Sequence, residues 1–324
     1  MRSLRHSPAL LATVALCMLA ATQPVDDQYL VHTVKKGESL SLICIDYYGR
    51  YTDGMGIAVQ HLNPGLKDIN LVYVGQKLKL RNPNRKPAPR APGAALVKDV
   101  KATQGVVTFV EGKAYLLGGG NKAKRMLSVN TVVAPGDTLV TGPGGRVELI
   151  VNRESVVRMR ANTRLAITAL RDNAGKKGAT SMGFSVGTVW AKVRKLAGKA
   201  SRFQMQLPTA VAGVHGTVYQ ASVAADSSAE VKVYTGAVAV EGHSQKGGAA
   251  GGAVSEVAGP QEVPGPHEVT MEEWVHIVRA MQKIAIDRDG GASGPESFAK
   301  VADEWEKWNE QRDRRIAEMF AREF

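Results

Sequence analysis

The sequence predicts a multidomain protein: a small βααβ module, an all-β domain of the sandwich or roll type, and an α-helical C-terminal tail. Three observations predict this fold class. Residues 30–81 place two helical patterns between two short strand patterns, and residues 97–241 contain many short alternating segments with glycine turns. Residues 270–324 carry apolar side chains at spacings of three and four. Two stretches rich in proline or glycine, 82–96 and 242–269, are predicted to be linkers.

The overall composition excludes several classes of protein. The chain has 324 residues, 44% of them apolar and 22% charged, which fits two or three globular domains and excludes global disorder. It lacks a run of about 18 apolar residues, which excludes a polytopic membrane protein. Two cysteines are too few for a disulfide framework or a four-cysteine zinc site.

Residues 1–22 have the pattern of a secretory signal peptide. Arg2 and Arg5 precede an apolar stretch at 9–21, which is too short to cross a bilayer comfortably. We therefore expect an exported protein of the periplasm or cell envelope with no persisting transmembrane helix, although no single cleavage site stands out. Export also argues against nucleic acid as the partner that the net charge of +12 would otherwise indicate. Cys44 then remains alone in an apolar run, which predicts a small buried hydrophobe.

Residues 30–81 predict the order strand, helix, helix, strand. Residues 30–34 alternate like a strand, and an apolar helical pattern from Leu40 stops at Gly49. A second helical run at 57–62 ends before Pro64, and the closing strand is predicted at 72–80. The residues at 50–56 read as a lengthened connection between the two helices.

This stretch resembles a LysM domain. The matching segments are residues 31–40 (VHTVKKGESL), 47–49 (YYG), 62–64 (LNP) and 73–80 (YVGQKLKL). The resemblance implies binding of N-acetylglucosamine-containing glycans, notably peptidoglycan, in a groove between two loops. The positions that it implies are Gly37, Glu38, Ser39, Leu40, Asn70, Leu71, Val72 and Tyr73. Backbone groups on such turns can pair with the amides and hydroxyls of a neutral sugar, but the same residues also fit an ordinary scaffold of turns and core.

The part from 97 to 241 is predicted to be all-β. In the segment 145–151, Val147, Leu149 and Val151 share one face and charged side chains the other, and the segments 157–161, 189–194 and 203–207 repeat this alternation. The region resembles a FecR domain in residues 135–149, 207–219 and 230–240. Founding members of that family relay a transporter signal across a membrane to a sigma factor. For this chain the resemblance implies an exported β-domain suited to contacts with an envelope protein.

Positive charge is concentrated in this predicted β-domain. Residues 105–241 hold 18 basic and 8 acidic side chains. The predicted basic patch consists of Lys192, Arg194, Lys195, Lys199 and Arg202, with Arg158, Arg160 and Arg164 on another hairpin. Such a patch can contact anionic envelope polymers or an acidic partner, but lysine and arginine also keep ordinary strand surfaces from aggregating.

No catalytic site, cofactor site or metal site is predicted. The chain lacks the His-Glu-x-x-His, Gly-x-Ser-x-Gly and P-loop motifs and a spaced set of histidines and cysteines. Glu148 and Glu154 flank a predicted strand turn, but nothing places them about a common bond, so both are expected to be surface charges.

The tail at 270–324 is predicted to be a helical hairpin. A capping box at Thr270–Glu273 precedes apolar residues at helical spacing, and a second helix is predicted from about Pro295. The apolar positions are Met271, Trp274, Val278, Met281 and Ile284, then Phe298, Val301, Trp305, Trp308, Ile316, Met319 and Phe320. These faces would pack on each other or on the β-domain, or bind a partner.

Together these features predict a non-enzymatic cell-envelope protein that binds peptidoglycan through its LysM-like module and displays a FecR-like interaction domain. The alternative is a periplasmic signalling or assembly adaptor that acts through protein contacts of the FecR-like domain and the tail.

Overall fold

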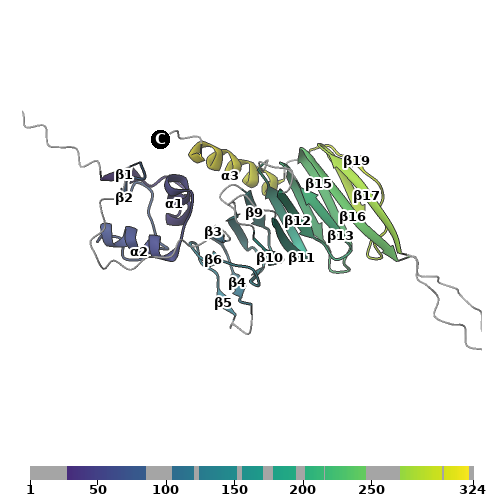
Figure 1. Cartoon of the computed structure of the whole chain (residues 1–324), viewed down its shortest axis with the longest axis horizontal. Coiled ribbons are helices and arrows are strands. Elements are labelled where there is room, and N and C mark those ends of the chain that lie inside the picture. Colours follow the sequence, from purple (N-terminus) through teal and green to yellow (C-terminus); the bar gives the residue numbers. More distant parts are fainter. Residues whose placement is uncertain are drawn as a thin grey trace, which may run out of the picture.

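The computed structural model describes residues 28–84, 104–119, 124–151, 155–170, 178–194, 201–214, 216–245, 271–300 and 303–320. A small αβ module, a large curled sheet and a C-terminal helix make up these residues (Figure 1). The predicted signal peptide and most of the two predicted linkers lie outside them. Within the described residues, no helix is both long and apolar enough to cross a membrane.

The N-terminal module, residues 28–84, has the predicted order of elements: β1 (Tyr29–Thr33), α1 (Leu40–Tyr48), α2 (Asp53–Leu62) and β2 (Lys77–Arg81). The strands β1 and β2 pair antiparallel. Helix α1 ends at Gly49, in the left-handed conformation (φ 68°), as predicted. Helix α2 begins four residues earlier than predicted, because the Thr52 hydroxyl accepts the Met55 N–H at 3.3 Å and caps the helix there.

The β-domain, residues 104–297, is a large curled sheet. Its strands are β3 (Gly105–Glu111), β4 (Ala114–Leu117), β5 (Arg125–Met126), β6 (Val132–Val133), β7 (Thr138–Thr141), β8 (Arg146–Val151), β9 (Ser155–Met159), β10 (Arg164–Ala169), β11 (Gly178–Lys192), β12 (Ser201–Gln206), β13 (Ala210–Val214), β14 (Val218–Val223), β15 (Ala229–Thr235), β16 (Ala237–Gln245), β17 (Met271–Arg279), β18 (Gln282–Ile286) and β19 (Glu296–Ser297). This confirms a mostly-β domain, whereas the sandwich or roll form stays a prediction.

The long strand β11 joins two halves of this sheet. Its first residues pair with β10 and β12, and its last residues pair with β9 and β14. The β11–β12 pair is parallel, and every other pair of strands in the described residues is antiparallel. Gly187 lies where β11 passes between the halves, with φ 106°, and a Cβ there would collide with Thr163. Glycine is therefore required at this position.

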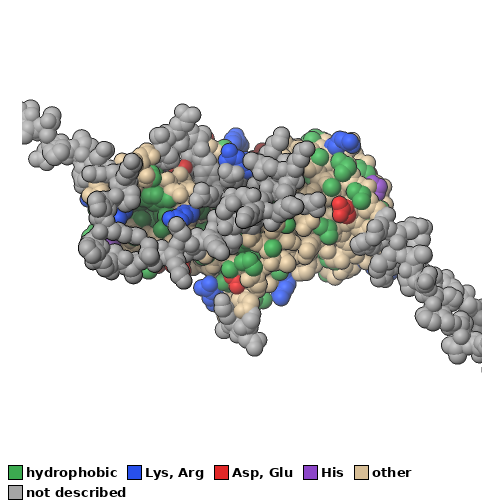
Figure 2. Space-filling view, viewed as in Figure 1, with side chains coloured by type: hydrophobic (Ala, Val, Ile, Leu, Met, Phe, Trp, Pro, Cys, Tyr) green, Lys and Arg blue, Asp and Glu red, His purple; other side chains and the backbone are tan. Residues whose placement is uncertain are grey.

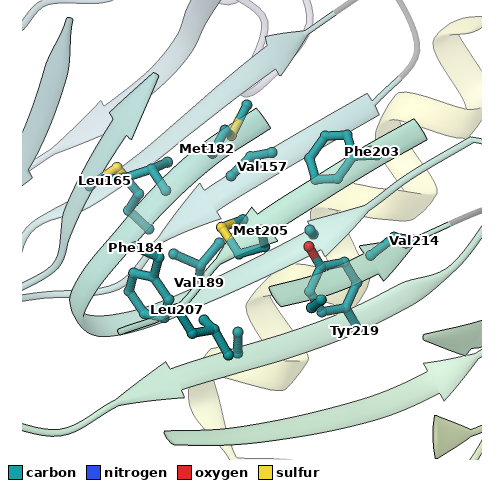
Figure 3. Packing of buried hydrophobic residues seen from close by; sticks show 14 of the residues in the cluster. Val157, Leu165, Met182, Phe184, Val189, Phe203, Met205, Leu207, Val214 and Tyr219 are labelled. Carbon is teal, nitrogen blue, oxygen red and sulfur yellow. The ribbon is translucent and has the colours of Figure 1, made fainter. Parts of the chain in front are cut away.

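The core of the β-domain lies between strands of both halves. Val157, Phe184, Phe203 and Tyr219 are among the buried residues that pack together there (Figure 3). The predicted alternation places Val147, Leu149 and Val151 of β8 in this core, as it does Phe203 and Met205 of β12. Burial on this scale is the main source of the stability of the domain.

The predicted helical hairpin at 270–324 is wrong in its first half. Residues 271–286 form the strands β17 and β18, which extend the sheet next to β16 and β15. Met281, with φ 61°, lies in the short turn between them. The helical spacing of Trp274, Val278 and Met281 coexists with a two-residue alternation, in which Val275 and Ile277 are exposed and Val278 is buried. The strand is favoured because β16 offers nine paired positions along its edge.

The second half of the tail is helical but shorter than predicted. Helix α3 spans Glu304–Phe320 and lies along one side of the molecule, from the β-domain towards α1 (Figure 1). The Trp305 side chain is buried and donates from Nε1 to Gln220 Oε1 at 3.1 Å. Its ring stacks on Trp308, which in turn packs against Phe109. The described apolar face of α3 is therefore used within the chain.

Candidate functional site

The first loop of the predicted groove, residues 34–39, connects β1 to α1. Gly37 has φ 80°, which turns the chain back towards the helix. Glu38 points inward, since its Oε2 lies 2.7 Å from His32 Nε2 and accepts the Lys35 N–H at 2.7 Å. The Ser39 hydroxyl caps α1 by accepting the Leu42 N–H at 3.3 Å. These contacts fix the conformation of the loop.

The second loop, residues 63–76, connects α2 to β2. Asn63 anchors its start, because its side chain donates to Val59 O at 2.7 Å and accepts the Lys79 N–H at 2.7 Å. The two loops are joined by the Gly75 N–H, which donates to Val34 O at 2.7 Å. The predicted groove residues of the two loops are thus brought to the same side of the module.

The two halves of the predicted groove differ in exposure. Glu38, Ser39 and Leu40 are 9%, 6% and 0% exposed, and Gly37 is half-buried. In the second loop Leu71 is 50% and Tyr73 is 62% exposed, Asn70 is also exposed, and Val72 is half-buried. Three of the four predicted positions in the first half are therefore buried, and three of the four in the second half are exposed.

Asn130 of the β-domain contacts both the start of α1 and the second loop. Its Oδ1 accepts the Ser41 N–H at 2.7 Å, and its Nδ2 donates to Ile69 O at 2.7 Å and to Asn70 Oδ1 at 3.1 Å. The Asn130 side chain therefore links the start of α1 to the second loop. Asn130 has φ 64° and is held by its own N–H, which donates to Val107 O at 2.7 Å. A small cleft of about 170 Å³, lined by residues of both domains, lies beside it.

Apolar contacts continue this junction. Val106, Ile150 and Val156, from β3, β8 and β9, belong to the same buried cluster as Leu40 and the rest of the N-terminal core. Ile316 of α3 completes the cluster. The face of these three strands that points away from the β-domain core is therefore buried against the N-terminal module.

A buried charge cluster lies between α3 and the strands β8 and β9. It consists of Glu148 on β8, Arg158 on β9, and Arg312 and Asp313 on α3. Arg158 Nε donates to Glu148 Oε2 at 2.7 Å, and Arg158 Nη1 lies 2.8 Å from Asp313 Oδ1. Arg312 donates to both oxygens of Glu148, and the Thr108 hydroxyl donates to Glu148 Oε1 at 2.8 Å. Glu148 and Arg158 are completely buried. Because each ion has partners of opposite charge, the cost of burying it is offset.

The electrostatics of Glu148 follow from this geometry. Burial alone would raise the pKa of the carboxyl, but Arg312 and Arg158 outweigh it and lower the pKa to about 2. Glu148 is therefore ionised at neutral pH.

Arg312 also reaches the predicted groove. Its Nη1 donates to Gly37 O at 3.0 Å, so a single side chain of α3 contacts β8 and the first loop of the N-terminal module. A Cβ at Gly37 would collide with the Arg315 guanidinium. Helix α3 thus lies directly over the turn at Gly37.

These contacts correct two predictions of surface charge. Glu148 was expected at the surface and is fully buried, and Arg158 belongs to the buried charge cluster rather than to an exposed hairpin. The strand prediction for β8 is confirmed, but the face assigned to solvent is covered by α3 and the N-terminal module. Glu154 lies outside the described residues.

The predicted basic patch is described in part. Lys192 is partly exposed, with its Nζ 3.9 Å from Asp313 Oδ2, and Arg194 is exposed. The side chains of Lys195, Lys199 and Arg202 lie outside the described part of the chain. On the face shown in Figure 2, lysine and arginine side chains are spread over the molecule rather than gathered in one place.

The described residues contain no cluster of three or more histidine, cysteine or acidic side chains placed to hold a metal. Cys44 is buried as predicted, and burial raises the pKa of its thiol to about 12, which disfavours the reactive thiolate.

Comparisons with known families agree with this division of the chain. Residues 32–81 match the family model of the LysM domain, and residues 137–239 match that of the FecR protein. The chain carries a LysM domain followed by a FecR domain. LysM domains are glycan-binding modules, FecR domains occur in signalling proteins, and both are typical of extracytoplasmic proteins. The LysM match includes both loops of the predicted groove.

Solved structures give a weaker likeness. The chain is similar to two crystal structures of a proposed anti-sigma factor from Parabacteroides distasonis, with 15% and 14% identity and TM-scores of 0.35 and 0.34. Each match covers 49% of this chain, which spans 59% of the length of that protein. No curated protein matches the chain in sequence.

Sequence reasoning missed Asn130 and Arg312 altogether. Asn130 lies between short strands with no motif around it, and Arg312 is one of several basic residues on a helix with alternating charges. The weak signal for Asn130 is its type, since asparagine tolerates the left-handed conformation that this turn requires.

Proposed function

We propose that the protein is a non-enzymatic cell-envelope protein, exported and associated with peptidoglycan, that binds N-acetylglucosamine-containing glycan through its LysM domain. The observation that carries this proposal is the LysM match over residues 32–81, with both loops of the groove present. The exposed Leu71 and Tyr73 provide an apolar surface for a sugar ring or its acetyl methyl group. The FecR domain is then displayed at the peptidoglycan for contact with an envelope protein.

The test is co-sedimentation of the full chain with purified insoluble peptidoglycan. We expect saturable retention that soluble N-acetylglucosamine oligomers reverse. Tyr73→Ala should weaken retention about tenfold, because the exposed ring contributes contact area without supporting the core. The matched control is Ile57→Ala, an exposed apolar residue on α2 that lies outside the groove. Absence of retention at every glycan concentration, with folding verified by circular dichroism, would refute glycan binding.

A second candidate function is that of a signalling or assembly adaptor, which the FecR match favours. In that case the β-domain binds an envelope protein, and the edge strand β17 offers exposed Val275 and Ile277 on its outer side. Crosslinking in intact cells followed by affinity purification tests it. Recovery of glycan without any specific protein would count heavily against the adaptor function.

A further inference from the structure

Both loops of the predicted groove contact the rest of the chain. Gly37 O of the first loop accepts a hydrogen bond from Arg312 of α3. Asn130 of the β-domain bonds Ser41 at the start of α1, and Ile69 and Asn70 in the second loop, while Leu71 and Tyr73 stay exposed. Since a sugar bound between the two loops needs both, the conformation described here cannot admit one at the position of Ser41 and Ile69 without displacing Asn130.

The chemistry of Asn130 matches part of the proposed ligand. Its carboxamide accepts one hydrogen bond from a backbone N–H, at Ser41, and donates one to a backbone carbonyl, at Ile69. The acetamido group of an N-acetylated sugar also has one carbonyl acceptor and one N–H donor on the same planar amide. The two groups can therefore satisfy the same pair of backbone partners.

We propose that the β-domain holds the LysM groove closed by placing the Asn130 carboxamide where the acetamido group of an N-acetylated sugar binds in the open form. This proposal rests on the glycan-binding function proposed above and adds how that function is controlled. Glycan and Asn130 compete for the Ser41 N–H and the Ile69 carbonyl. Binding to the glycan strand requires the domains to separate at this point.

Helix α3 also contacts the first loop of the LysM domain and favours the closed form. Arg312 Nη1 donates to Gly37 O, and the Arg315 guanidinium lies over the same glycine. Asn130 and Arg312 come from two segments far apart in the sequence and contact the two sides of the predicted groove, Asn130 at Ser41, Ile69 and Asn70 and Arg312 at Gly37. The buried Ile316 of α3 belongs to the core cluster of the same module.

The apparent association constant for glycan should then equal the association constant of the open form multiplied by the fraction of molecules that are open. Asn130 makes three hydrogen bonds to the LysM domain, and each is worth about a factor of 2 to 12 in an equilibrium constant. Removing all three should increase the open fraction at least about tenfold.

The test compares the binding of a soluble N-acetylglucosamine tetramer to the full chain and to three variants by isothermal calorimetry. Asn130→Gly removes the carboxamide and keeps a residue that accepts positive φ. Asn130→Asp keeps the size and shape of the side chain, but it replaces the amide group that donates to the Ile69 carbonyl with a carboxylate oxygen, which cannot donate. The matched control is Asn162→Gly, which changes another asparagine of positive φ that is exposed and makes no contact of this kind.

We expect Asn130→Gly to bind the tetramer at least about tenfold more tightly than the unmodified chain, and Asn162→Gly to bind as the unmodified chain does. Asn130→Asp should show a smaller increase, because its carboxylate still accepts the Ser41 N–H and loses only the two bonds donated by the amide nitrogen. Amide hydrogen exchange at Ser41 should accelerate in Asn130→Gly without glycan, while exchange in the core of β11 stays unchanged. This readout also verifies that the variants are folded.

Equal binding by all four proteins would overturn the closed groove and leave the glycan-binding function intact. Weaker binding by the Asn130 variants would also overturn it, since Asn130 would then be part of a shared sugar site. If none of the four proteins binds while Ser41 exchange shows that the groove has opened, the proposed function fails and this inference fails with it.

Discussion

Two groups of charged side chains in the protein use the same residue types in different surroundings. The buried charge cluster joins Glu148, Arg158, Arg312 and Asp313, with side-chain exposures of 0–14%. The surface charge cluster joins Glu230, Lys232, Lys283 and Glu296 on β15, β18 and β19, with exposures of 29–62%. The first connects α3 to β8, which are far apart in sequence, whereas the second connects neighbouring strands that already pair through their backbones.

The difference teaches that the number of ion pairs says little about what a charged cluster does. Water screens the surface charge cluster, so its members can be lost without leaving an unbalanced charge in the interior. The members of the buried charge cluster depend on one another, because each is unfavourable without its partners. We therefore expect the four changes below to rank by burial rather than by the number of contacts.

The largest effect is expected for Glu148→Ala. The change leaves Arg158 and Arg312 in the interior without their shared carboxylate, which should cost about 3–5 kcal/mol of unfolding free energy. Urea unfolding followed by circular dichroism measures it, with Glu111→Ala as the control, an exposed glutamate that faces Arg146. A loss below about 1 kcal/mol in comparison with the control would mean that water reaches the buried charge cluster.

Acidification should have the next largest effect. Because the pKa of Glu148 is lowered from 4.5 to about 2 in the folded protein, its contribution to stability is complete above about pH 4.5. That contribution, about 3 kcal/mol, is lost as the pH falls from 4.5 towards 2. Unfolding free energies measured at pH 7, 5, 4 and 3 test it. Glu148→Gln should lack this component and show a shallower decline over the same range, and an identical decline in both proteins would contradict the assignment.

Arg158→Lys should have an intermediate effect. Lysine keeps the positive charge but cannot span Glu148 and Asp313 as the guanidinium does, so the variant should lose about 1.5–3 kcal/mol. The same denaturation experiment checks it. Arg146→Lys is the matched control, since Arg146 is 31% exposed, forms one long ion pair with Glu111 and lies 5.5 Å over the Trp308 ring, a contact that a lysine ammonium can also make. Equal losses of unfolding free energy in the two variants would show that the planar guanidinium of Arg158 is unimportant in the buried charge cluster.

The smallest effect is expected for Glu230→Ala in the surface charge cluster. Its lysine partners remain hydrated after the change, so the melting temperature should stay within the error of the measurement at 150 mM salt. Melting curves at low and high salt give the comparison. A clear drop at both salt concentrations would break the contrast between the two clusters.

The order of elements in the LysM domain could be predicted because short-range signals determine it. Ser39 caps α1 and Gly49 ends it, and both signals are visible in the sequence. The strands of the β-domain could also be predicted from alternation, as β8 and β12 illustrate. In these cases the residues that decide the structure are close together in the chain.

The failures have a different physical origin. The prediction for residues 271–286 failed because their apolar pattern fits both helical and strand spacing. Pairing with β15 and β16 favours the strand, and the local sequence does not reveal that pairing. Glu148 was misplaced because Arg312 of α3, which pairs with it in the interior, lies 164 positions away in the chain. The contacts of Asn130 with Ser41 and Ile69, and of Arg312 with Gly37, join separate domains, so no local pattern in the sequence predicts them.

The contact between Arg312 and Gly37 joins residues separated by 275 positions. A ribosome makes the LysM domain before α3, so this contact cannot form until α3 has been synthesised. Until then the turn at Gly37 lacks its covering helix, and Glu148 and Arg158 lack the two residues that complete their cluster. The junction between the domains is therefore a late event in the maturation of each molecule, and a molecule truncated before residue 304 never reaches it.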